Sequence, residues 1–141
     1  MHALSPVAML MPMVAMVALT FIVWLRLYVV RVGELRERRI DPQRLASAKA
    51  AGELLARTQA SDNLRNLFEM PVLFYALCLA VVSVGVTSPF LVNGAWAYVV
   101  SRAVHSLIHC TYNRVMHRFI VYATSCVLLA VLWAAFLARV L

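Results

Sequence analysis

The chain has 141 residues, of which 64% are apolar and only 13% are charged. An ordinary soluble domain has about 45–50% apolar and about 25% charged residues, so this composition excludes both a water-soluble domain and an intrinsically disordered chain. The 3 cysteines are too few for a disulfide scaffold. The net charge of +7 raises the question of nucleic acid, but the basic segment at residues 31–65 has no aromatic side chain for base stacking. We therefore expect no nucleic-acid partner.

Apolar segments long enough to cross a bilayer follow one another along the chain. A helix that spans the hydrocarbon core needs about 20 mostly apolar residues. Residues 3–25 and 119–138 are uncharged, and so are residues 70–101, which are too many for one span and contain the turn signals Thr87-Ser88-Pro89 and Asn93-Gly94. The sequence predicts one all-α domain over residues 1–141, an integral membrane four-helix bundle. Its expected spans lie at about 4–30, 63–86, 91–112 and 117–138.

Basic residues concentrate in two connections between these spans. They lie in the segment 31–65 and in the short turn 113–118, which a four-span topology places on the same side. The positive-inside rule makes that side cytoplasmic. The first span is expected to be retained rather than removed as a signal peptide, because it lacks a basic n-region and arginines follow it. We expect the membrane to be a bacterial inner membrane, with a cytoplasmic loop at about 32–62.

Polar side chains follow one face of the third predicted span. At about 100° per residue these side chains fall within an arc of about 100°. Ionisable groups inside a span are costly and usually face a bundle interior or a wet cavity, so they indicate a functional site. Hydrogen bonding that only holds the bundle together is the alternative interpretation. The members of this stripe are Tyr98, Arg102, His105, His109, Tyr112 and Asn113.

Two further polar groups lie at the expected cytoplasmic ends of the neighbouring spans. Asp62, Asn66 and Glu69 share a face at the start of the second span, where the acids are also favoured by the helix dipole. Arg114, His117 and Arg118 open the fourth span, where ordinary positive-inside anchoring is the alternative. Together with the stripe, these groups predict a cavity open to the cytoplasm that suits a small zwitterion or polyanion.

Metal binding is not expected. His105 and His109 stand four residues apart on one face, but no carboxylate or cysteine completes a ligand set. Cys78, Cys110 and Cys126 have no paired spacing and are expected to be buried apolar side chains.

These residues resemble the MAPEG superfamily, the membrane-associated proteins in eicosanoid and glutathione metabolism, in a bacterial-type form. The resemblance covers essentially the whole chain and is carried by Arg65-Asn66-Leu67-Phe68-Glu69 before a proline, by Arg102-x-x-His105, and by Arg118. It implies a homotrimer that binds glutathione as co-substrate between subunits near the cytoplasmic face. It also implies a lipophilic small molecule from the bilayer as the second substrate.

Carried over by motif, the implied glutathione-binding residues are Arg65, Asn66, Glu69, Arg102 and His105, with His109 where several members have tyrosine and Tyr112 from the stripe. Arg118 is the implied catalytic residue, because a neighbouring cation favours the reactive thiolate. The chain departs from the family pattern at Asp62 and Phe119, where members commonly have arginine and some have serine. The predicted function is that of a glutathione-dependent transferase or peroxidase. The alternative is a non-catalytic membrane protein whose polar stripe serves oligomerisation, lipid binding or partner binding.

Overall fold

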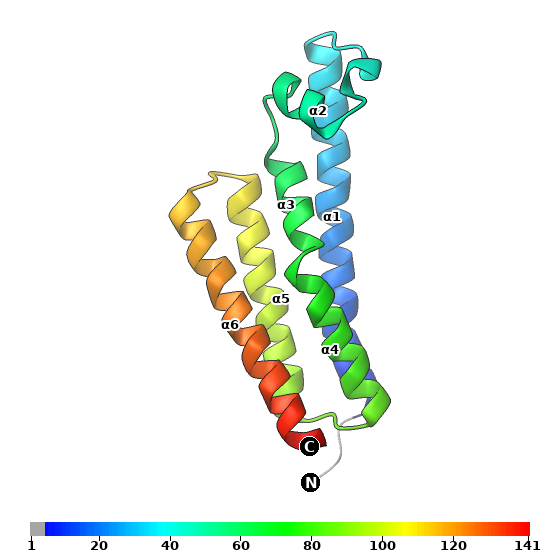
Figure 1. The fold of residues 1–141 in the computed structure, drawn as a ribbon, viewed down its shortest axis with the longest axis vertical. Helices are drawn as coiled ribbons and strands as arrows, with labels where there is room; N and C mark the ends of the chain where they lie inside the picture. The colour runs from blue at the N-terminus through cyan, green and yellow to red at the C-terminus, as the bar shows by residue number, and fades with distance from the viewer. Residues whose placement is uncertain (1–4) are drawn as a thin grey trace.

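A computed structural model gives the structure of the protein, and it describes residues 5–141. The chain is all-helical over these residues, as the sequence predicts, and no strand occurs among them. Figure 1 shows the long helices side by side, with η1 and α2 gathered at the C-terminal end of α1. The elements are α1 (Val7–Glu37), η1 (Pro42–Leu45), α2 (Ala48–Leu54), α3 (Gln59–Leu67), α4 (Met70–Val84), α5 (Pro89–Cys110) and α6 (Val115–Val140).

Within residues 5–141, three helical segments are long and apolar enough to cross a membrane: α1, the α3–α4 segment over Gln59–Val84, and α6. Helix α5 carries Arg102 and two histidines and packs along α6 while also contacting α1 and α3. Its role as a fourth span stays a prediction. The predicted start of the first span, near residue 4, lies outside the described residues.

Helix α1 is longer than a membrane crossing requires. Its 31 residues extend over about 46 Å, against about 30 Å for the hydrocarbon core. Arg26 ends the uncharged part, so we expect the last turns of α1 to project beyond the bilayer. The segment containing η1 and α2 folds back on this projection (Figure 1).

Glu34 fastens the returning segment to α1. Its buried carboxylate accepts hydrogen bonds from the backbone N–H groups of Ala56 (2.7 Å) and Arg57 (3.2 Å) and from Arg38 (2.9 Å). Burial raises the pKa of Glu34, but the Ala56 N–H, the Arg38 guanidinium and the Arg57 N–H outweigh it, and the net pKa lies below the ordinary value. Arg38 also donates to the carbonyl of Leu54 at 2.6 Å.

One of the two expected turn signals between the second and third spans is a turn. Gly85 ends α4 in the left-handed region (φ 77°), and the hydroxyl of Ser88 caps α5 by accepting from the N–H of Leu91. Asn93-Gly94, in contrast, lies inside α5, so its interpretation as a turn is wrong. Gly94 is there because α5 and α6 approach closely: a Cβ at this position would lie 2.4 Å from Cδ2 of Leu132.

Candidate functional site

A cavity of about 200 Å³ opens between the end of α3, the second half of α5 and the first turns of α6. It takes one residue from each of the three polar groups that the sequence singles out, namely Asn66, His105 and Arg118. Its remaining lining residues are Val115, Phe119 and Tyr122.

Arg102 lies next to this cavity as a buried cation that forms no ion pair with the described residues. Its side chain is fully buried, and its Nη2 donates to the backbone carbonyl of Asn66 at 3.2 Å. The guanidinium carbon lies 5.1 Å from the centre of the Tyr122 ring, a cation–π distance. Its Nε and Nη1 have no hydrogen-bond partner among the described residues. A buried arginine left in this state favours a ligand that brings acceptors.

The backbone carbonyl of Asn66, which Arg102 contacts, is free because the helix is interrupted between α3 and α4. Pro71 has no N–H and cannot pair with the carbonyl of Leu67, and Glu69 leaves the helical region at φ −93° and ψ −99°. The series of helical backbone hydrogen bonds therefore stops at the end of α3, and the carbonyl of Asn66 is left to accept from Arg102. The expected single helix from about 63 to 86 is consequently two helices.

The two buried histidines of α5 are oriented by Arg118. Nδ1 of His105 lies 3.1 Å from the backbone carbonyl of Arg118, and because a carbonyl only accepts, this nitrogen carries the proton. Nε2 of His105 is buried without a partner among the described residues, and in the neutral ring it is the nitrogen that keeps a free lone pair. Nε2 of His109 accepts from Nη1 of Arg118 at 2.8 Å, because arginine only donates.

Arg118 is held from a second side by Asn113. The same Nη1 donates to Oδ1 of Asn113 at 3.0 Å. Asn113 occupies the left-handed region (φ 48°), which asparagine tolerates better than most residues, in the turn between α5 and α6. Nε and Nη2 of Arg118 have no partner within residues 5–141, so two donor positions remain for a ligand.

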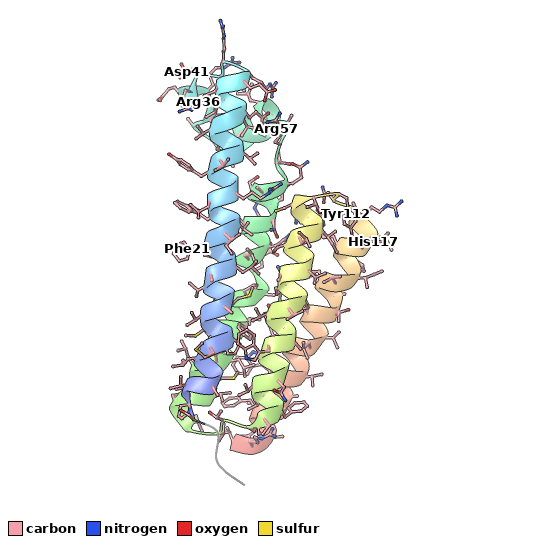
Figure 2. The ribbon with its side chains drawn as sticks, turned by 180° about the vertical axis from the view of Figure 1, so that it is seen from behind. Phe21, Arg36, Asp41, Arg57, Tyr112 and His117 are labelled. Atoms are coloured by element: carbon pink, nitrogen blue, oxygen red, sulfur yellow. The ribbon has the colours of Figure 1, made fainter. Side chains whose placement is uncertain are left out.

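The other expected site residues lie outside this cavity. The side chains of Arg65 and Glu69 are exposed, and Arg65 lines a different cavity. His109 is buried behind Arg118. Tyr112 is exposed and its hydroxyl lies 3.2 Å from Nδ1 of His117, at the end of the α5–α6 pair that Figure 2 shows.

Sequence reasoning missed Tyr122, although its position gave a signal. It follows Arg118 by four residues, so both point to the same face of α6. It also missed a structural link between α3 and α5: the hydroxyl of Ser106 donates to Oδ1 of the buried Asn63 at 3.3 Å, and Nδ2 of Asn63 donates to Sγ of Cys110 at 3.5 Å.

An all-helical chain with helices long and apolar enough to cross a bilayer, and with arginine and histidine buried between them, is an integral membrane protein. The particular family follows from the sequence. The model of the MAPEG family matches residues 9–138, nearly the whole chain, and the protein belongs to this family. No curated protein and no solved structure matches the chain.

Proposed function

We propose that the protein binds glutathione at the Arg118 cavity, beside the buried Arg102, and activates its thiol toward a lipophilic electrophile or peroxide, as a transferase or peroxidase. Family membership supports this class of function. The observation that carries it is the buried Arg102, whose free Nε and Nη1 stand beside a cavity that Arg118 also lines. Such a site favours a ligand with carboxylate groups and a thiolate.

The residues present fit this ligand. The free donors of Arg102 are suited to a carboxylate, and the side chain of Asn66 can orient a peptide amide from the cavity wall. The lone pair on Nε2 of His105 can accept a hydrogen bond from the bound molecule. A thiol reacts as its thiolate, and the two free donors of Arg118 would stabilise that negative charge. His109 and Asn113 hold Arg118 in one orientation for this task.

The size of the cavity favours a site shared between subunits. Its volume of about 200 Å³ is smaller than the about 300–1,000 Å³ of typical small-molecule sites. The exposed side chain of Glu69 is then available to a ligand held against a neighbouring copy. We therefore place the site at an interface of a homotrimer of four-helix protomers, with the lipophilic substrate arriving from the bilayer beside the exposed Phe119.

Figure 1 places the η1–α2 segment and the α5–α6 turn towards one end of the molecule. These are the two basic connections, so we propose that this end and the cavity face the cytoplasm, in a bacterial inner membrane.

Titration with glutathione tests the proposal. A ligand that binds only the folded protein raises its melting temperature with concentration. We expect this rise for the detergent-purified wild type, and we expect Arg118→Ala to reduce it and to abolish thiol-dependent conjugation. Arg114→Ala is the matched control, since it removes the same charge from an exposed residue one turn away that does not line the cavity.

Two outcomes would contradict the proposal. If millimolar glutathione leaves the wild-type melting temperature unchanged, the buried polar residues serve the assembly of the helices, as the Asn63–Ser106 link already does. If Arg118→Ala retains wild-type conjugation, Arg118 does not stabilise the thiolate.

A further inference from the structure

A second cavity lies between α1 and α3, on the side of α3 that carries Arg65. It has a volume of about 310 Å³. Its charged lining residues are Arg31 from α1 and Asp62 and Arg65 from α3, and the η1–α2 segment closes it with uncharged residues. The cavity therefore holds two cations and one carboxylate.

The cations of this cavity are not paired within the protein. The ion pairs among the described residues are Arg38–Glu34 and Arg57–Glu37, and neither involves Arg31 or Arg65. Nε of Arg31 is buried without a hydrogen-bond partner in the described part of the chain. A buried guanidinium nitrogen with no acceptor, in a cavity of net positive charge, favours an anionic ligand.

The position of the cavity along α1 places it at the depth of lipid headgroups. Trp24 and Tyr28 are exposed and stack on each other with ring centroids 6.1 Å apart. Exposed tryptophan and tyrosine gather where a membrane meets water. Arg31 follows Tyr28 by three residues, about 4.5 Å further along the helix axis and away from the apolar part.

An apolar groove lies beside this cavity, nearer the uncharged part of α1. The groove has a volume of about 440 Å³ and runs between α1 and the α3–α4 segment. Trp24 lines the groove and Arg31 the cavity, seven residues apart and hence on the same face of α1. On α3, Arg65 lines the cavity and Phe68 the groove, which again share a face. The remaining groove residues are Met13, Val17, Thr20, Phe21, Leu64, Tyr75 and Leu79.

We propose that these two neighbouring hollows together form a binding site for an anionic phospholipid, with its phosphate at Arg31 and Arg65 and an acyl chain along the groove. Arginine is suited to phosphate because its planar fork donates two parallel hydrogen bonds. The hydroxyl of Thr58 is a further donor in the lining. The carboxylate of Asp62 opposes the phosphate charge and sets an upper limit on affinity.

Short-chain lipid added to the detergent-purified full chain tests the site. We expect dioctanoyl phosphatidylglycerol to raise the melting temperature saturably, and Arg31→Gln to raise the half-saturating concentration about tenfold, the loss of one charged hydrogen bond. Arg36→Gln is the matched control: it removes the same charge from an exposed residue near the tip of α1 (Figure 2) that does not line the cavity. An equal loss of lipid affinity in Arg36→Gln would overturn the proposal. The lipid would then be attracted by the overall positive charge of the basic segment and not by the cavity.

Three further arms keep the test decisive if Arg31→Gln folds poorly. Asp62→Asn is expected to lower the half-saturating concentration about threefold, because it removes the opposing charge. Val17→Trp, which fills the groove, is expected to weaken the lipid response. Inorganic phosphate should stabilise the protein far less than the lipid, and an equal response would show that the site takes a soluble anion rather than a lipid. If neither Asp62→Asn nor Val17→Trp changes the response to the lipid, the proposal is also overturned. None of these substitutions touches a residue that lines the Arg118 cavity, so glutathione titration reports separately.

Discussion

The close approach of α5 and α6 at Gly94 gives a prediction about stability. Whether a methyl group added at this position stabilises or destabilises the protein depends on Leu132. The substitution Gly94→Ala would place a Cβ 2.4 Å from Cδ2 and 3.3 Å from Cγ of Leu132. Carbon atoms in good contact are about 3.5–4.0 Å apart, so a methyl group of Leu132 must move by about 1 Å or the two helices must separate. Leu132 is fully buried and has little room for that movement.

The magnitude follows from two opposing terms. Inserting a methyl group into a packed core costs about 1–3 kcal/mol, while alanine is favoured over glycine in a helix by up to about 1 kcal/mol. We expect Gly94→Ala to destabilise the wild-type protein by up to about 2 kcal/mol. In a Leu132→Ala background the clash disappears, and the same substitution should stabilise the protein by up to about 1 kcal/mol.

Reversible unfolding in sodium dodecyl sulphate, followed by loss of helical circular dichroism, measures all four members of this cycle. Gly33→Ala is the control, because a Cβ there meets nothing within 4 Å and the substitution should be stabilising. If Gly94→Ala stabilises the wild-type protein as much as Gly33→Ala does, then the two helices do not meet at Gly94 and the reasoning is refuted.

Three further predictions follow from single contacts. Arg102→Met should leave stability within about 1 kcal/mol of wild type, because a buried unpaired cation is replaced by an apolar side chain, and it should abolish the glutathione-induced rise in melting temperature. Glu34→Gln should lower the hydrogen-exchange protection of the Ala56 amide about tenfold at pH 7. Because the folded pKa of Glu34 is depressed, its stabilising effect is present above the ordinary value of 4.5 and lost as the pH falls through the folded pKa, so wild type and variant should converge there. Ser106→Ala should cost about 1–2 kcal/mol in melting experiments by leaving the buried Oδ1 of Asn63 unpaired, with glutathione binding unchanged.

The sequence predicts the helices better than it predicts their ends. Apolar segments and charge are sufficient for an all-helical membrane protein, because the bilayer requires every backbone group to pair internally. Gly94 illustrates the limit: after asparagine it has the local signature of a turn, yet it lies in a helix. The residue is a glycine because a neighbouring leucine occupies the space that a side chain would need. That requirement comes from α6, about 40 residues later, and no local pattern contains it.

The same limit applies to the candidate site. Helical spacing places Arg102, His105 and His109 on one face of α5, and the structure buries all three. Spacing does not determine which residues of neighbouring helices meet that face, because this depends on how α3 and α6 pack against α5. Tyr122 lines the cavity and Glu69 does not, although Glu69 has the more conspicuous chemistry.

Helix α3 separates the two proposed sites, and its early end makes this possible. Asn66 faces the Arg118 cavity and Arg65 the Arg31 cavity, because consecutive residues differ by about 100° around a helix. A continuous helix through residue 70 would pair the carbonyl of Asn66 with the N–H of Met70 and leave Arg102 without its acceptor. Glu69 leaves the helical region and Pro71 lacks the N–H that would pair with the carbonyl of Leu67, so α3 ends early and the carbonyl of Asn66 remains to accept from the buried arginine beside the cavity. A short helix thus separates the proposed thiol site from the proposed lipid site.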